Sequence, residues 1–126
     1  MIFVYTLDTN AIIYYIKDDP VVIKVIEGIL AKGSRLYVST ISEVELFCFP
    51  ELGDEEARRI DALLGTVSII SVDSQIARSA GTLQSKYGLH LGDAMIAATA
   101  IFTGTALLTR NIRDFKKVPA LRVQRI

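Results

Sequence analysis

Apolar and polar positions alternate along the chain in a way that predicts strands separated by helices. Short apolar and β-branched runs predict strands, and longer stretches bounded by helix-starting and helix-ending residues predict helices. The predicted strands are residues 2–7, 36–39, 67–72, 106–109 and 121–124. The predicted helices are residues 10–17, 20–31, 42–49, 54–64, 73–87 and 92–102. This alternation is typical of a parallel sheet covered on both faces, so we expect an α/β fold, a three-layer α/β/α sandwich with a mostly parallel central sheet.

Single residues mark where several of these helices begin and end. Pro20 suits the first position of a helix, because its missing N–H has no partner there. Asp54 is expected to cap the helix that it begins. Gly33, Gly88 and Gly104 follow predicted helix ends, where glycine is the usual stop.

Composition indicates one globular domain over residues 1–126. Of the 126 residues, 51% are hydrophobic, which is enough for a real core, and we find no repeat or linker. The longest apolar stretch, residues 94–108, is interrupted by polar residues and is shorter than the ~20 residues that a membrane span needs. The first apolar run is too short for a signal peptide. Cys48 has no cysteine partner within the chain, which fits a reducing compartment. We therefore expect a cytoplasmic protein without membrane contact.

The net charge is zero, but the charges are unevenly distributed. Residues 1–75 hold six Lys and Arg against twelve Asp and Glu, and residues 76–126 hold eight against two. Six of these eight basic residues lie in the last seventeen residues: Arg110, Arg113, Lys116, Lys117, Arg122 and Arg125. Such an asymmetry is typical of a surface that binds a polyanion, and an ordinary solvated tail explains it as well.

Acidic residues follow several of the predicted strands. Asp8 comes directly after the first strand, and Glu45 lies one short turn beyond the second. Asp93 begins the helix that leads to a later strand, and Asp114 follows that strand. Ligands of parallel α/β sheets bind at the carboxyl ends of the strands, so we expect these acids to converge. Each acid also has a structural alternative, namely helix capping for Asp8, the helix dipole for Asp93 and a solvated surface for the others.

Periodicity does not decide between two candidate acids in the third predicted helix. Glu43 and Glu45 differ in direction by about 200° at 3.6 residues per turn, so one can face water while the other faces the sheet edge. Converging carboxylates raise one another's pKa, and a hard divalent cation with oxygen ligands relieves that repulsion. One cysteine and one histidine, His90, give poor support to a zinc site or a Cys–His or Ser–His hydrolase.

Four segments carry a resemblance to a known family. They are "LDTNAII" at residues 7–13, "VSTISEVEL" at 38–46, "GDAMIAATA" at 92–100 and "LLTRNIRDF" at 107–115. In this order and over nearly the whole chain, they resemble the PIN-domain family, and within it the small VapC-like ribonuclease toxins. The last two segments together are the most specific part of the resemblance.

The resemblance implies an endoribonuclease that depends on Mg²⁺ or Mn²⁺, acts on RNA as a homodimer and is silenced by a small antitoxin protein. By matched position it implies four acidic catalytic and metal-binding residues: Asp8, Glu45, Asp93 and Asp114. Glu45, rather than Glu43, matches the family's second acid. The polar positions that match around the pocket are Thr9, Thr109 and Asn111. The basic residues near enough in sequence to bind the RNA backbone are Arg110, Arg113, Lys116 and Lys117.

Two other functions and one further expectation stay open at this point. A magnesium-dependent phosphatase with an aspartyl nucleophile also places an Asp after its first strand, but it requires a second Asp two residues later, where this chain has Asn10. A non-catalytic PIN-like interaction module is the other alternative, although all four acids are present. A small domain is not expected to bury all of the strongly apolar residues 11–30, which predicts a homodimer through this region. Simple core packing of both helices explains them as well.

Overall fold

The computed structural model describes residues 4–126, and its centre is a parallel sheet. Within these residues the sheet has five strands in the order β3-β2-β1-β4-β5, and every neighbouring pair is parallel. The strands are β1 (Tyr5–Leu7), β2 (Leu36–Ser39), β3 (Ser68–Ile70), β4 (Ala106–Thr109) and β5 (Val123–Arg125). Since β1 lies in the middle, the residue that follows it emerges at the centre of the sheet's carboxyl edge.

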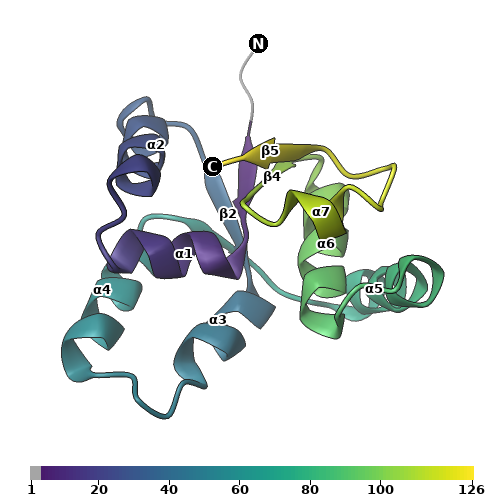
Figure 1. The fold of residues 1–126 in the computed structure, drawn as a ribbon, viewed down its shortest axis with the longest axis horizontal. Helices are drawn as coiled ribbons and strands as arrows, with labels where there is room; N and C mark the ends of the chain where they lie inside the picture. Colours follow the sequence, from purple (N-terminus) through teal and green to yellow (C-terminus); the bar gives the residue numbers. More distant parts are fainter. Residues whose placement is uncertain (1–3) are drawn as a thin grey trace.

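Helices cover both faces of the sheet. They are α1 (Thr9–Ile16), α2 (Pro20–Ala31), α3 (Thr40–Phe47), α4 (Asp54–Leu64), α5 (Ser74–Tyr87), α6 (Leu91–Thr103) and α7 (Ile112–Phe115). Figure 1 shows α1, α2 and α4 on one side of the sheet, α5 and α6 on the other, and α3 between these two groups. The described chain has two apolar cores, and neighbouring residues of β4 belong to different ones, Leu108 to the first and Leu107 to the second. The predicted three-layer α/β/α sandwich is confirmed.

Predicted boundaries hold best where a proline or glycine fixes them. The helix at residues 20–31 and the strands at 36–39 and 106–109 are confirmed residue for residue. Gly88 and Gly104 end their helices with φ of 70° and 67°, a left-handed conformation that glycine adopts without strain. Of the predicted strand at residues 2–7, residues 5–7 are confirmed, and residues 1–3 lie outside the described part of the chain.

Other boundaries were predicted wrongly. Asp54 is the first residue of α4 rather than its cap, and Gly53 occupies the capping position. The third helix begins at Thr40, two residues earlier than predicted, because the Ser39 side chain accepts a hydrogen bond from the Ile41 N–H and caps it. The short helix α7 was not predicted. None of the helices in residues 4–126 combines the length and apolar character that spanning a membrane requires.

The apolar region expected to form a dimer surface contributes to the core with one side of each helix. Ile12 and Ile16 of α1 and Val22 and Ile26 of α2 are buried in the core on one face of the sheet. Core packing explains these residues, whereas Val21 is 56% exposed. A dimer through α1 and α2 therefore stays a prediction.

Candidate active site

Asp8 is held at the central carboxyl edge of the sheet and is almost completely buried. Its backbone N–H donates to the Leu108 carbonyl oxygen at 3.1 Å, which continues the pairing of β1 with β4. Its side chain is 3% exposed and accepts a 2.7 Å hydrogen bond from the Thr109 hydroxyl. Asp8 occupies the capping position of α1, but its side chain makes no capping hydrogen bond. The alternative that Asp8 serves as a helix cap is therefore wrong.

The surroundings of Asp8 disfavour its charge. The pKa of Asp8 is raised to about 6, chiefly by burial and also by the negative charges of Asp93 and Glu45, although the hydrogen bond from Thr109 lowers it. Burial is also the largest cause of a raised pKa at Asp93, followed by the charge of Glu45, and Asp114 contributes in the same direction. Asp8 between β1 and α1, Glu45 of α3 and Asp93 of α6 therefore repel one another.

Glu45 reaches this space through contacts with two other helices. Thr9 Oγ1, at the first position of α1, donates to Glu45 Oε1 at 2.7 Å, and Ser42 Oγ lies 2.8 Å from the same hydroxyl oxygen. On the other side the carboxylate lies against Gly92 of α6, where a Cβ atom would stand 2.9 Å from Glu45 Oε2. The structure thus brings Glu45 beside Asp93, at the position that the resemblance selects over Glu43.

Asp114 lies on α7 in a setting that favours its charge. Asn111 caps α7, and its side-chain nitrogen donates to Asp114 Oδ2 at 3.0 Å. This hydrogen bond is the largest cause of a lowered pKa at Asp114, and the nearby Arg113 and Lys117 add to it. Asn111 also donates its backbone N–H to the Thr109 hydroxyl at 2.9 Å, while that hydroxyl donates to Asp8. Thr109 and Asn111 therefore link Asp8 to Asp114 through hydrogen bonds, whereas Thr9 belongs to the separate contact with Glu45.

The four acids fit a hard divalent cation by the chemistry of their donors. All of them are carboxylates, and the buried, like-charged setting of Asp8 and Asp93 favours a nearby positive charge. Within residues 4–126, no group of three or more His, Cys, Asp or Glu side chains is arranged to hold an ion directly. Mg²⁺ commonly takes one or two carboxylates and keeps several waters, so two protein ligands are enough.

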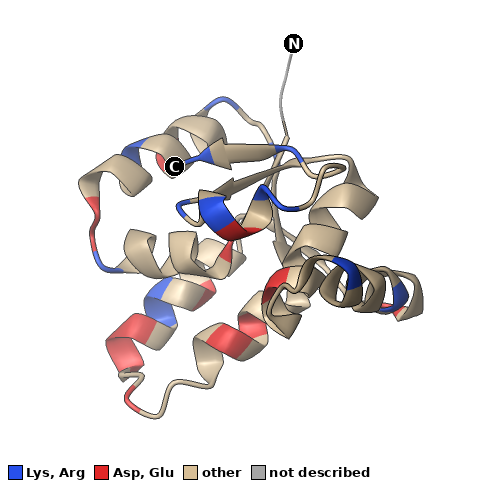
Figure 2. Ribbon diagram, turned by 45° about the vertical axis from the view of Figure 1, so that its right-hand side comes forward, with Lys and Arg blue, Asp and Glu red and all other residues tan. Residues whose placement is uncertain are grey.

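The predicted basic residues divide into two groups. Arg110 is used by the fold: it pairs with Asp19 at 2.9 Å, lies 4.6 Å from the centre of the Tyr14 ring and donates to the Ile126 carbonyl oxygen. Arg113, Lys116 and Lys117 are exposed on and after α7. Figure 2 shows basic residues gathered on α7 and the C-terminal segment, and acidic residues on α3 and α4.

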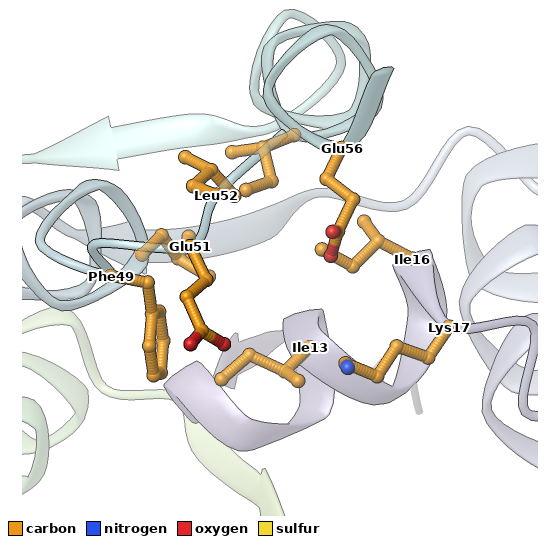
Figure 3. A pocket seen from close by; sticks show the side chains of 9 residues that line it. Ile13, Ile16, Lys17, Phe49, Glu51, Leu52 and Glu56 are labelled. Atoms are coloured by element: carbon orange, nitrogen blue, oxygen red, sulfur yellow. The ribbon is translucent and has the colours of Figure 1, made fainter. Parts of the chain in front are cut away.

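A separate apolar pocket of about 280 Å³ lies between α1, α3 and α4, and the sequence did not indicate it. Figure 3 shows Ile13, Ile16, Phe49 and Leu52 around it, with Lys17, Glu51 and Glu56 at its edge. Because its walls come from three helices and from the segment between α3 and α4, no single stretch of sequence carries its pattern.

Sequence reasoning also missed two residues of the site, Ser42 and Gly92. Ser42 precedes Glu45 by three residues, so the helical period places both on one face of α3. Gly92 is a glycine inside a helix where no turn is needed. Both signals were present in the sequence, but their connection to Glu45 depends on contacts between α1, α3 and α6.

The chain as a whole matches one known family. The sequence model of the PIN domain matches residues 5–121. This chain belongs to the PIN-domain family. The match covers nearly the whole chain.

Among its relatives is the tRNA(fMet)-specific endonuclease VapC of Salmonella typhimurium, which is 30% identical over 95% of this chain and 96% of the relative. Among solved structures, VapBC2 from Rickettsia felis bound to a promoter DNA fragment aligns with a TM-score of 0.84, 25% identity and coverage of 98% and 99% of the two chains. A toxin–antitoxin complex from Klebsiella pneumoniae aligns with a TM-score of 0.79, 29% identity and coverage of 93% and 94%.

Proposed function

We propose that this PIN domain is a metal-dependent endoribonuclease and the toxin of a toxin–antitoxin pair, acting in the cytoplasm as a single catalytic domain. The observation that carries the proposal is the buried Asp8 carboxylate, whose pKa of about 6 reflects burial together with the charges of Asp93 and Glu45. A group of buried acids that repel one another at the ligand-binding edge of a parallel sheet is typical of a functional site. The ribonuclease names of its VapC relatives support RNA as the substrate.

Each acid has a role in this proposal. Asp8 and Asp93 would hold a Mg²⁺ or Mn²⁺ ion, and Glu45 and Asp114 would orient water or hold a second ion. Such an ion would supply an activated water for attack on a phosphodiester and would neutralise charge on the phosphate. The Thr109 hydroxyl fixes Asp8 through its 2.7 Å hydrogen bond, and Asn111 fixes Thr109 and Asp114 in turn.

RNA binding falls to the basic residues around α7. Arg113, Lys116 and Lys117 are exposed beside Asp114, where they can contact phosphates on either side of the bond to be cut. The ion pair and ring contact of Arg110 support a different role, in which it braces the turn between α1 and α2. The proposed RNA-binding set is therefore reduced to three residues.

The antitoxin is proposed to dock on the apolar pocket between α1, α3 and α4. The apolar floor complements an apolar segment, and Glu51, Glu56 and Lys17 at its edge offer charges of both signs. The toxin–antitoxin complex among the solved structures supports a protein partner. A homodimer stays a prediction, and sedimentation at micromolar concentration tests it.

The deciding experiment measures RNA cleavage by the purified chain in Mn²⁺, in Mg²⁺ and in EDTA, beside an Asp93→Asn variant. We expect cleavage with either ion, and none in EDTA or with the variant. Hydrolysis of a small phosphate monoester without RNA cleavage would identify a phosphatase instead. A protein that binds an antitoxin-like peptide but cleaves neither substrate would be an interaction module.

A further inference from the structure

The Glu45 carboxylate is fixed by contacts that come from outside its own helix. A glutamate side chain has three rotatable bonds before its carboxylate, so on an open surface it samples many positions. Here one oxygen, Oε1, accepts a 2.7 Å hydrogen bond from Thr9, and the other, Oε2, lies where the Gly92 side chain would be. The hydrogen bond restrains the terminal group from α1, and the absent side chain of Gly92 leaves room for it beside α6.

The hydrogen atoms of the two hydroxyls can be assigned by counting donors. The Thr9 hydroxyl has one hydrogen, which it donates to the Glu45 carboxylate, because an ionised carboxylate only accepts. The 2.8 Å contact between Ser42 Oγ and Thr9 Oγ1 therefore uses the Ser42 hydrogen. Ser42 is fully buried and Thr9 is 6% exposed, so water does not compete for either hydroxyl. The direction of donation is Ser42 to Thr9 to Glu45.

The glycine at position 92 is explained by space rather than by backbone conformation. Its φ is not in the left-handed region, and it is the second residue of α6, where alanine would favour the helix more. A Cβ atom at this position would stand 2.9 Å from Glu45 Oε2 and 3.4 Å from Glu45 Cδ. Real Cβ atoms do not come that close, so any side chain here displaces the carboxylate.

We propose that Gly92 and Ser42 are positioning residues that hold the Glu45 carboxylate beside Asp93, Gly92 by leaving room for it and Ser42 through the Thr9 hydroxyl. This inference rests on the proposed function in one respect, the catalytic use of Glu45. The position of the carboxylate itself can be tested without any activity.

The first test replaces Gly92 by alanine and uses Gly81→Ala as the matched control. Gly81 lies inside α5, its φ is not left-handed and nothing lies within 4 Å of its Cβ position. Both variants should melt at or above the wild-type temperature in EDTA, because alanine favours a helix over glycine. Gly92→Ala alone should lower Mn²⁺ affinity, measured by calorimetry, or kcat by roughly 10- to 100-fold, with KM for RNA little changed.

A double-mutant cycle separates positioning from a general structural effect. If Gly92 acts through Glu45, Gly92→Ala should have no further effect on kcat or Mn²⁺ affinity in a Glu45→Ala protein. A loss of equal size in both backgrounds would overturn the inference. In the same way, Ser42→Ala and Thr9→Val should reduce kcat in the wild-type background but not in the Glu45→Ala protein. Thr9→Ser keeps the hydroxyl and should therefore keep kcat near the wild-type value.

A crystal structure of Gly92→Ala distinguishes this inference from the proposed function. The Glu45 carboxylate should move away from the Thr9 hydroxyl, and a retained hydrogen bond with an unmoved carboxylate would overturn the inference even if the wild type cleaves RNA. A wild-type protein that neither binds Mn²⁺ nor cleaves RNA would overturn the proposed function, while a displaced carboxylate would still support the positioning role.

Discussion

Asp8 and Asp114 carry the same carboxylate, but their surroundings shift its pKa in opposite directions. Asp8 is buried at the centre of the sheet edge, and burial raises its pKa to about 6. Asp114 lies on a surface helix, where Asn111, Arg113 and Lys117 lower its pKa. The fold therefore stabilises the charge at one acid and opposes it at the other. The charge of Asp8 lowers the stability of the folded protein. Functional sites commonly trade stability for activity, so this charge points to a function.

The largest test of this contrast is removal of the buried charges. Asp8→Asn and, separately, Asp93→Asn should reduce RNA cleavage by more than the roughly 100-fold expected for residues that only support metal ligands. Their melting temperatures in EDTA should hold or rise, because one of the repelling charges is gone. Stabilisation by added Mn²⁺, followed in the same melting assay, should shrink. An Asp8→Asn protein that melts lower and still cleaves at the wild-type rate would mean that Asp8 has a purely structural role.

The pH dependence of stability sharpens the contrast further. The pKa of Asp8 is about 6 in the folded protein, against 3.8 for an unperturbed aspartate. Between these two pH values the folded state therefore binds more protons than the unfolded state. The free energy of unfolding in EDTA should therefore fall as pH rises through this window, by at most roughly 3 kcal/mol from this group. Asp93, whose pKa is also raised, acts in the same direction. The lowered pKa of Asp114 instead contributes stability that is lost as pH falls.

Urea unfolding of the wild type and of Asp8→Asn across this pH range measures the effect. The stability gained by the variant should be near zero at pH 4 and should grow up to pH 7. An equal difference at all pH values would show that the Asp8 carboxyl titrates normally in the folded protein.

Removal of the Asp114 charge should have a smaller effect on stability, and of the opposite sign. Asp114→Asn keeps an oxygen for the hydrogen bond from Asn111 but loses the attraction to Arg113 and Lys117. We expect a melting temperature in EDTA at or below that of the wild type and a loss of cleavage of about tenfold, typical of a supporting residue. A gain in melting temperature like that of Asp8→Asn would remove the distinction between the two acids.

The smallest expected effect concerns the cations next to Asp114. Replacement of Lys116 and Lys117 by alanine should weaken RNA binding and reduce the dependence of log K on log salt by about one to two units, roughly one for each lost phosphate contact. Lys24→Ala, on the exposed side of α2, serves as a control for a general loss of positive charge. A salt dependence unchanged from the wild type would place the two lysines away from the RNA.

The fold could be predicted from the sequence where local chemistry decides the structure. The bounds of α2 follow from Pro20 and the glycine after its end, and β4 follows from its short apolar run. Helix α7 was missed because four residues are too few to show a helical period, and its cap, Asn111, resembles any polar loop residue.

Parts of the site depend on residues far apart in sequence, and these could not be predicted. The ion pair between Arg110 and Asp19 joins residues 91 positions apart, so the sequence made Arg110 look available for RNA. Whether Glu45 or Glu43 faces the pocket depends on Thr9 and Gly92, which belong to other helices. The four acids were found because parallel strands bring their carboxyl ends to one edge, a rule that needs no side-chain detail.

The central place of β1 in the sheet has a consequence for motion. Strand β1 is hydrogen-bonded on both sides, to β2 and to β4, and the amide of Asp8 extends that ladder to Leu108. Amide hydrogens in such a position exchange with solvent only when most of the domain opens. Hydrogen exchange at Asp8 should therefore be among the slowest in the protein, and far slower than at the short surface helix that carries Asp114. The backbone beneath the first acid is thus already ordered before any ligand arrives, and binding there costs little conformational entropy.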